Sequence, residues 1–253
     1  TIQLLGDPYD PPARRELPRG RRLADPGFMT RFPGGKVEIG GSIRSLSPFW
    51  IDVLPVTNGD YLTFMAAGGY TDREVWSEEG WEWLEISRAK MPEYWSWDDG
   101  VWWSRCLLQE TPLDLTRPVI HVSCYEAEAF ARFVGKRLPS EIEWEAAAGW
   151  DPETQSRRLY PWGNMAPTPH VANLDQLAFA PAPVGAFPGN LSPIGCYGMI
   201  GDIWEWTSSD FDDESKVLRG GSWATRTGAI DVSVRRASRP ENRKMFSGFR
   251  CAM

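Results

Sequence analysis

Few residues in this sequence have side chains suited to metal binding or nucleophilic catalysis. His121 and His170 are its only histidines. A facial iron site needs about three protein ligands, so these histidines alone cannot provide one. Zinc sites and disulfide frameworks use closely spaced cysteines, and this chain has no CxxC pair, so we expect free and mostly buried thiols. The cysteines are Cys106, Cys124, Cys196 and Cys251.

The overall charge argues against one large class of partners. The formal net charge is -7 and the isoelectric point is near 5.0, whereas a general nucleic-acid binder needs a clustered basic face. No stretch approaches the roughly 18 to 20 apolar residues of a membrane span, and the first residues show no apolar signal core. We therefore expect no general nucleic-acid binding and no membrane insertion. The cytoplasm is the default location, with surface display or secretion as open alternatives.

The elements that must position any site are short. The chain has 14 Trp, 24 Gly and 21 Pro, a composition that favours turns, irregular cores and short strands over a helical bundle. The segments FPGGKVEIGG and SPFWIDVLPV predict two short strands. After them, Thr57 and Asp60 predict the start of a helix, and Gly68 with Gly69 its end. The predicted fold class is α+β with long loops.

Two further helices carry the same signal at their N-termini. Ser123 and Glu126 form a capping box in SCYE. Ser140 and Glu143 form another in SEIE, directly before an alanine-rich run. In each box the hydroxyl and the carboxylate satisfy two backbone N–H groups that a helix start leaves unpaired. The sequence therefore predicts two helices in succession, and two to three in all.

The rest of the chain has a simple predicted organisation. The Trp-rich segment 76–103 predicts an aromatic cluster under a long loop, with a stacking wall for a small ligand as the alternative. Residues 1–27 are rich in Pro and Arg and predict an extended lead-in. Residues 28–253 contain no repeat and no linker, which predicts a single domain.

Six islands, in order along the chain, resemble the formylglycine-generating enzyme and sulfatase-modifying-factor family. They are PVTNGDYLTF (55–64), RPVIHVSCYEAEAFARFVGKRLPSEIEWEAAA (117–148), YPWGN (160–164), GMIGDIWEWTSS (198–209), RGGSW (219–223) and GFRCA (248–252). The resemblance implies a variant of the C-type lectin fold. Within the family, FMTRFPGGKVEIG, GGYTDREVWSEEGWEWL and MFSGFR are most similar to the C-terminal half of the iron-dependent sulfoxide synthases of ergothioneine biosynthesis.

The resemblance implies chemistry whose residues are replaced here. Formylglycine generation uses a copper-binding cysteine pair whose positions fall near Thr227 and Val232, and neither residue can replace a thiolate. The sulfoxide synthases hold iron with histidines supplied largely by a separate helical domain. Their Trp, Asp and Arg at the substrate correspond to Ala237, Ser238 and Asn242 in this chain. We therefore expect no catalytic residues in it.

One inorganic site is implied by the same resemblance. Relatives hold calcium at the turn that corresponds to GDIWEW, where Asp202 and Glu205 offer hard oxygen ligands. Of a second calcium motif, Asn173 is matched and a later carboxylate is missing. The alternative for Glu205 is a buried carboxylate paired with an arginine. A structural calcium ion is the cofactor that the resemblance implies.

The segment 224–246 follows no helical period. Its apolar residues alternate in DVSV, which predicts one short strand with Asp231 and Ser233 pointing outward. On a C-type lectin scaffold this segment lies at the ligand-binding face. It is similar to the variable segment of diversity-generating retroelement proteins, in which the varied codons end in C. The candidate variable, ligand-binding positions are Ala224, Thr225, Arg226, Thr227, Asp231, Ser233, Arg236, Ala237, Ser238, Arg239, Asn242 and Phe246.

Codon usage and charge add further predictions for this segment. Codons that end in C cannot encode Glu, Lys or Met, so Glu241, Lys244 and Met245 are predicted to be fixed by the template. An arginine-rich patch on an acidic protein favours a carboxylate, a phosphate or an acidic protein surface. Its arginines are Arg226, Arg236, Arg239 and Arg243. The arginines predicted to form buried pairs with Glu or Asp are Arg235, Arg243 and Arg250.

Two functions are compatible with these observations. The first is a non-catalytic ligand-binding protein that displays a hypervariable C-terminal recognition surface, with a protein or another acidic surface as its partner. The alternative is a free-standing relative of the C-terminal half of an iron-dependent sulfoxide synthase, which needs a separate iron-binding partner. An ordinary lectin-like domain with a solvated loop is a third interpretation. Neither the ligand nor the oligomeric state follows from the sequence.

Overall fold

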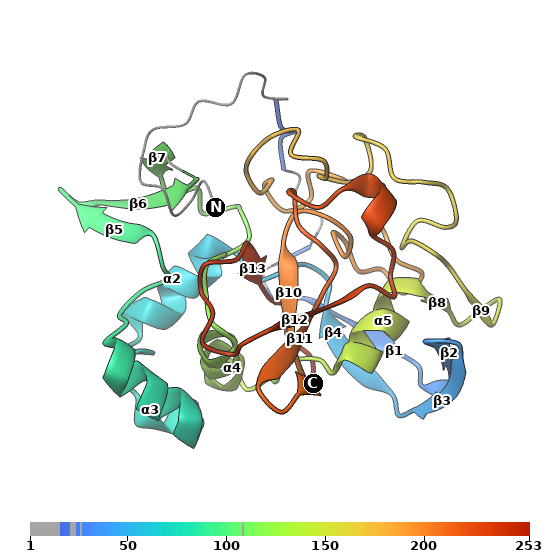
Figure 1. Cartoon of the computed structure of the whole chain (residues 1–253), viewed down its shortest axis with the longest axis horizontal. Coiled ribbons are helices and arrows are strands. Elements are labelled where there is room, and N and C mark those ends of the chain that lie inside the picture. The colour runs from blue at the N-terminus through green and yellow to red at the C-terminus, as the bar shows by residue number, and fades with distance from the viewer. Residues whose placement is uncertain (1–15, 21–23, 26, 108) are drawn as a thin grey trace.

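The computed structural model of the chain describes residues 16–20, 24–25, 27–107 and 109–253. Most of the predicted lead-in, residues 1–27, lies outside these residues. The described part combines four α-helices, short strands and long loops (Figure 1), whereas the sequence predicted two to three helices. None of the helices in this part is long and apolar enough to cross a membrane.

The elements are distributed along the whole described chain. The helices are α2 (Asn58–Ala66), α3 (Glu78–Ser87), α4 (Cys124–Phe133) and α5 (Glu141–Gly149), with 3-10 turns η1 (Arg73–Val75) and η2 (Thr227–Ala229). The earlier strands are β1 (Met29–Phe32), β2 (Gly35–Ile39), β3 (Ser42–Leu46), β4 (Phe49–Asp52), β5 (Trp95–Asp98), β6 (Val101–Cys106) and β7 (Gln109–Pro112). The later strands are β8 (Trp150–Asp151), β9 (Ser156–Arg157), β10 (Trp204–Asp212), β11 (Ser215–Arg219), β12 (Arg235–Ser238) and β13 (Ser247–Gly248).

A four-stranded sheet in the order β12-β11-β10-β13 forms the centre of the molecule. Its strands are antiparallel except for the pair β10 and β13, and α4 and α5 lie to either side of it in Figure 1. The end of the chain pairs with β4, because the amide of Trp50 donates to the carbonyl of Met253 at 3.0 Å. Residues 224–246 lie between β11 and β13 of the central sheet and include its outer strand, β12.

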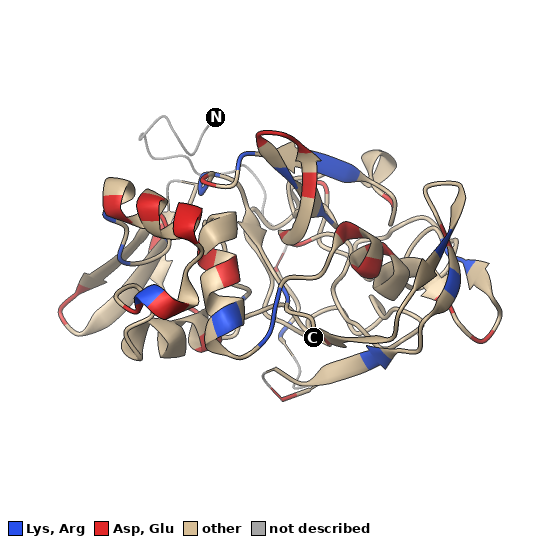
Figure 2. Ribbon diagram, turned by 90° about the horizontal axis from the view of Figure 1, so that it is seen from below, with Lys and Arg blue, Asp and Glu red and all other residues tan. Residues whose placement is uncertain are grey.

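The predicted helix starts are confirmed by their capping geometry. Thr57, Ser123 and Ser140 each accept a hydrogen bond from the backbone N–H of the third helical residue. The carboxylates of those third residues accept in return from the backbone N–H of the cap, which completes each capping box. These first turns are also acidic, which suits the positive end of a helix, and Figure 2 shows acidic residues on the helical ribbons.

The Trp-rich segment differs from its prediction as a long loop. It contains α3, β5 and the start of β6, and these two strands form a three-stranded sheet with β7, which follows the segment. The side chain of Ser77 caps α3 by accepting from the amide of Gly80, and Arg88 ends the helix in the left-handed conformation at φ 54°. Trp76 and Trp95 lie in the main core, so the aromatic residues are shared between the core and this local sheet.

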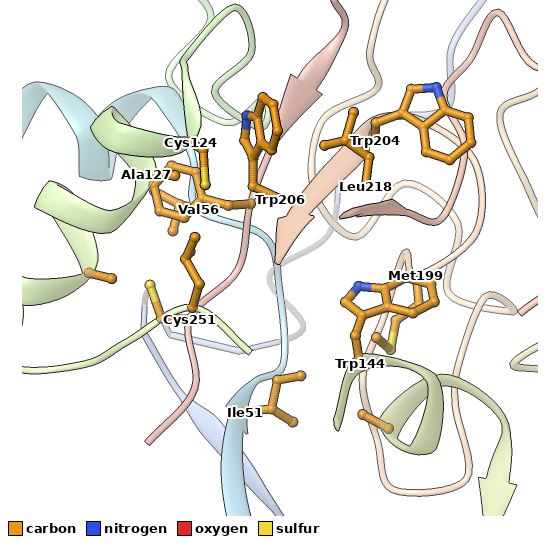
Figure 3. Packing of buried hydrophobic residues seen from close by; sticks show 14 of the residues in the cluster. Ile51, Val56, Cys124, Ala127, Trp144, Met199, Trp204, Trp206, Leu218 and Cys251 are labelled. Carbon is orange, nitrogen blue, oxygen red and sulfur yellow. The ribbon is translucent and has the colours of Figure 1, made fainter. Parts of the chain in front are cut away.

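The core packs large aromatic residues against the central sheet. Figure 3 shows Trp204 and Trp206 projecting from β10 near Trp144 of α5 and Cys251. The indole N–H of Trp144 donates to Glu205 at 2.7 Å, and that of Trp206 donates to the carbonyl of Val122 at 2.9 Å. These indoles therefore bury apolar area without leaving their polar atoms unpaired.

The cysteines are free, as the sequence predicted. Cys124, Cys196 and Cys251 are buried, and Cys106 is half-buried. Burial raises the pKa of Cys196 to about 11, so this thiol stays protonated and unreactive near neutral pH.

The predicted DVSV strand is wrong. Residues 231–234 form a turn, and the strand β12 begins at Arg235. Asp231 accepts hydrogen bonds from the backbone N–H and the hydroxyl of Ser233, at 2.6 and 2.5 Å, a local pairing that competes with strand geometry. The alternation nevertheless identified a residue that packs inward, because Val232 is fully buried.

Candidate functional site

A surface hollow of about 550 Å³ lies where β10, β12 and the loops around them meet. Its size is within the usual range of small-molecule sites, about 300 to 1,000 Å³. Its walls mix small, apolar, aromatic and cationic side chains. The lining residues are Trp204, Ser222, Ala224, Thr225, Ala229, Val234, Arg235, Arg236, Lys244, Met245 and Phe246. The hollow is therefore built mainly from the segment that the sequence singled out.

The hollow carries positive charge that the protein only partly neutralises. Arg235 is paired with Glu141, with 2.5 Å between Nε and a carboxylate oxygen. The guanidinium of Arg236 instead lies 5.7 Å from the ring centroid of Trp204. Within the described part of the chain, neither Arg236 nor Lys244 forms an ion pair with a carboxylate. Two cations are thus available beside an aromatic wall.

A mostly buried arginine, Arg243, holds the C-terminal wall of the hollow. Arg243 binds both carboxylate oxygens of Glu126, at 2.9 and 3.0 Å, and binds Glu93 at 2.8 Å. Tyr70 donates to the same Glu126 carboxylate at 2.5 Å. The carbonyl of Pro240 accepts from the amide of Cys124, the first residue of α4. Residues 240–246 are therefore held on the N-terminal end of α4.

A second buried arginine fixes the opposite wall. Arg219 is fully buried and pairs with Glu145. Its guanidinium also donates to the carbonyls of Ser233 and Val232, at 3.0 and 2.8 Å. Because these bonds satisfy backbone groups in a turn, residues 231–234 keep one conformation without belonging to a sheet.

Of the three predicted buried arginine pairs, that of Arg250 is confirmed, and that of Arg243 is confirmed as a pair that is mostly buried. Arg250 is fully buried against Glu205. Arg243 is 12% exposed and its partner Glu126 is fully buried. Arg235 does pair with a carboxylate, but its side chain is 43% exposed, so the prediction of burial is wrong there. Arg235 lies on β12, the outer strand of the central sheet, where one side faces solvent.

Four of the predicted ligand-binding positions line the hollow: Ala224, Thr225, Arg236 and Phe246. Three others lie at the surface outside it. Arg226 and Ala237 are exposed, and Arg239 pairs with Glu214.

The side chains of the remaining five predicted positions form hydrogen bonds within the protein. Thr227 hydrogen-bonds Asp175 through its backbone amide at 2.8 Å and through its hydroxyl. Asp231 and Ser233 bind each other, as described above. Asn242 donates to the hydroxyl of Ser238 at 3.0 Å. Ser238 is 6% exposed and donates to the sulfur of Met245, so its prediction as part of an outward surface is wrong. Its side chain lies on the same face of β12 as Arg236 and is covered by Met245.

Several lining residues were missed by sequence reasoning. Trp204 belongs to IWEWTSS, which resembles scaffold, and Lys244 and Met245 are predicted to be fixed by the template. The sequence does contain a signal for Trp204. In WEW, aromatic and charged residues alternate as in a strand, so the two Trp side chains point to the same face. Trp206 is fully buried while Trp204 is 6% exposed and reaches the hollow. Lys244 carries no comparable signal.

A larger hollow of about 800 Å³ lies between α2, α3 and β6. Trp81 and Trp102 are among its lining residues, with Arg88 and Lys90. None of its lining residues belongs to segment 224–246. This hollow is therefore the place where the Trp-rich segment could form the stacking wall that the sequence suggested. That a ligand binds there stays a prediction.

The two candidate calcium ligands bind separate sets of N–H donors. Asp202 accepts from the side chain of Asn173 and the amide of Ala182, both at 2.7 Å. Both oxygens of Glu205 accept from Arg250, at 2.8 and 2.9 Å. Glu205 thus has the partner that the alternative interpretation gave it. Within the described residues, no group of three or more His, Cys, Asp or Glu side chains is arranged to hold a metal ion.

Asp202→Asn is expected to stabilise the protein at alkaline pH. Burial raises the pKa of Asp202 from 3.8 to about 6, so its contribution to stability is greatest below about pH 4 and is lost as the pH rises through 6. Asparagine keeps an oxygen acceptor and tolerates the left-handed backbone, φ 68°. At pH 8 the variant should gain about 2 kcal/mol in the free energy of unfolding.

Urea unfolding at pH 5 and pH 8 measures this effect. Asp213→Asn, at an exposed position, is the matched control and should change stability at neither pH. Adding calcium in the same experiment tests the calcium prediction. A bound ion would stabilise the wild type and would not stabilise Asp202→Asn. Equal pH profiles for wild type and Asp202→Asn would contradict the assigned pKa.

The histidines differ in environment. His170 is exposed, as predicted. His121 is 2% exposed, and its Nδ1 lies 3.1 Å from the carbonyl oxygen of Arg243. Burial lowers the pKa of His121 to about 4, although the backbone of Arg243 and Met245 favours its protonated form. His121 is therefore neutral near pH 7 and supports the wall that contains Arg243.

Comparison with known proteins agrees with this architecture. Residues 16–253 match the model of the sulfatase-modifying factor enzyme 1-like domain. The chain belongs to this family. Its described residues have the α+β, C-type lectin-like fold that the family shares. One solved structure with this fold, variable protein 1 of Treponema denticola, has a TM-score of 0.57 and 18% identity, and the match covers 88% of this chain and 94% of that one.

The family contains relatives with different activities. A hercynine oxygenase of Mycobacterium tuberculosis is 40% identical over 223 residues, which cover 81% of this chain and 52% of that protein. An inactive C-alpha-formylglycine-generating enzyme 2 of Bos taurus is 32% identical, with 88% and 87% covered. The chain spans about half the length of the hercynine oxygenases it matches. Family membership therefore shows the fold and leaves the activity to be argued from the site.

Proposed function

We propose that this domain binds a small anionic ligand in the hollow formed by Trp204 and segment 224–246. The observation that carries the proposal is the pair Arg236 and Lys244, which lack a carboxylate partner among the described residues. On a protein of net charge -7, such local cations are suited to an anionic group. Trp204 offers a surface on which the apolar part of the ligand can pack.

The likeness to hercynine oxygenases supports one biological role for this site, which is part of an enzyme. In that role the domain is the ligand-binding part of an oxygenase of similar type, and the iron ligands come from outside the described residues. His121 supports this division, because it is buried and bonded to the backbone of Arg243. The test is iron-dependent oxygen consumption with hercynine when the domain is combined with a histidine-rich helical partner. Consumption that does not require this domain would contradict the proposal.

A second role, display of a hypervariable surface, is favoured by where the lining comes from. Ala224, Thr225, Arg236 and Phe246 line the hollow, while the anchors Arg219 and Arg243 are not among its lining residues. The lining could thus vary without loss of the scaffold. Sequencing independent copies of the gene tests this idea. It predicts differences at the candidate positions with a template copy nearby, and differences spread evenly over the gene would refute it.

Arg236→Gln and Lys244→Gln are expected to weaken binding of benzoate, an aryl carboxylate probe, by about tenfold each, because each removes a charged hydrogen bond. Isothermal titration calorimetry measures the affinity. Benzamide, which is neutral and nearly isosteric, is the matched probe and should bind weakly to all variants. Arg235→Gln is the matched variant and should have a smaller effect, since Arg235 is already paired with Glu141. If benzamide binds as tightly as benzoate, the proposal of an anion site fails.

A further inference from the structure

Three residues that have a buried polar atom without a partner adjoin one residue of the hollow, Phe246. In the described residues, seven buried side-chain nitrogen or oxygen atoms have no hydrogen-bond partner. Three of them are Nε2 of His121, Nε1 of Trp223 and Oγ of Ser247. The ring of Phe246 lies 4.4 Å from that of Trp223 and 5.5 Å from that of His121, centroid to centroid. Ser247 is its neighbour in sequence.

Such a group of atoms requires an explanation. A buried donor or acceptor that lacks a partner costs about 1 to 3 kcal/mol, so native proteins retain few of them. His121 and Trp223 are each 2% exposed and Ser247 is fully buried, so bulk solvent does not compensate them. Phe246 is half-buried and lines the hollow. Its ring therefore contacts the rings of His121 and Trp223 and also borders the hollow.

The three atoms have complementary hydrogen-bonding roles. The Nδ1 of His121 faces the carbonyl oxygen of Arg243, which can only accept, so Nδ1 carries the proton and Nε2 is left as an acceptor. The indole N–H of Trp223 can only donate, and the hydroxyl of Ser247 can do both. A group that both donates and accepts a hydrogen bond would satisfy this arrangement.

We propose that Phe246 covers a polar subsite formed by His121, Trp223 and Ser247, and that this subsite takes a neutral donor–acceptor group of the ligand, such as a primary amide. The subsite deepens the proposed function, on which it rests. One end of the ligand binds Arg236 and Lys244, and the other end reaches the subsite when the ring of Phe246 turns aside.

The backbone geometry suits a movement of this side chain alone. The carbonyl of Phe246 accepts from the amide of Trp204 at 2.9 Å, and Ser247 pairs with Trp204 in the sheet. The main chain is therefore fixed on both sides of the ring. The half-buried ring of Phe246 can change rotamer toward the hollow without disturbing these bonds.

The experiment follows the indole N–H resonance of Trp223 by NMR in protein labelled with ¹⁵N-tryptophan, with Trp223→Phe used for its assignment. Acetamide is the probe, and acetone, which only accepts a hydrogen bond, is its matched control. Acetamide should shift this resonance saturably in the wild type, and acetone should bind more weakly because it leaves Nε2 of His121 unpaired. Phe246→Ala should bind acetamide about tenfold more tightly, since the covering ring is gone.

Phe246→Leu keeps an apolar side chain and serves as the second variant should Phe246→Ala not fold. Its expected affinity for acetamide lies between those of the wild type and Phe246→Ala. An unchanged Trp223 resonance in the wild type and in each folded variant would overturn the subsite. Failure of the anion site is distinguishable, because benzoate would then not bind while acetamide still shifts Trp223. Benzoate binding without any acetamide response would leave the proposed function intact and refute only the subsite.

Discussion

Arg250→Met is expected to lower the free energy of unfolding by about 3 to 5 kcal/mol, the usual effect of breaking a buried ion pair on one side. Arg250 is fully buried and binds both oxygens of Glu205. It also donates to the carbonyls of Asp52 and Val53, at 3.0 and 3.2 Å, and of Tyr197 at 2.9 Å. Methionine fills similar space but leaves the Glu205 charge and these carbonyls without their donors.

Urea unfolding measures this loss, and two further variants locate its cause. Arg239→Ala removes an exposed pair with Glu214 and should cost no more than about 0.5 kcal/mol. Glu205→Met combined with Arg250→Met should be less destabilised than the sum of the single variants, because no lone buried charge remains. A loss below about 1 kcal/mol for Arg250→Met would show that the pair is not what joins β10 to β4.

The helix starts could be predicted because their causes are local. A hydroxyl and a carboxylate three residues apart satisfy the first amides of a helix whatever the rest of the fold does. Helix α3 carries a weaker signal of this kind: Ser77 caps it without a complete box, and no glycine follows its end. The aromatic residues nearby then suggested a loop, although they belong partly to the core and partly to the sheet β5-β6-β7.

The site was predicted less well because its geometry depends on distant partners. The sequence located the segment and four of its lining residues, since the segment departs from any regular period. It could not show that Ser238 is buried, because this depends on Met245, seven positions away, which packs over it. Nor could it show that residues 231–234 turn, because the carbonyls there are satisfied by Arg219, 13 and 14 positions away.

The second large effect is expected at Arg243, which joins the wall of the hollow to the core. Arg243→Met should lower the free energy of unfolding by about 3 to 5 kcal/mol, because the fully buried Glu126 loses its partner. Arg243→Lys keeps the charge but cannot bind both carboxylate oxygens and Glu93 at once. We expect a smaller loss of stability for the lysine variant, measured by the same urea titration.

The affinity for benzoate distinguishes two roles of Arg243: holding the wall of the hollow in place, or stabilising the fold alone. Because Arg243 adjoins Lys244 in the chain, Arg243→Lys should also weaken benzoate binding at temperatures where the variant is fully folded. Lys244→Gln is the matched control: it should weaken binding and leave stability unchanged, since Lys244 is exposed. A folded Arg243→Lys protein that binds benzoate like the wild type would mean that the wall keeps its shape without this pair. The arginine would then stabilise the fold alone, and the cations of the hollow would be positioned by the pairing of β12 and β13 with the central sheet.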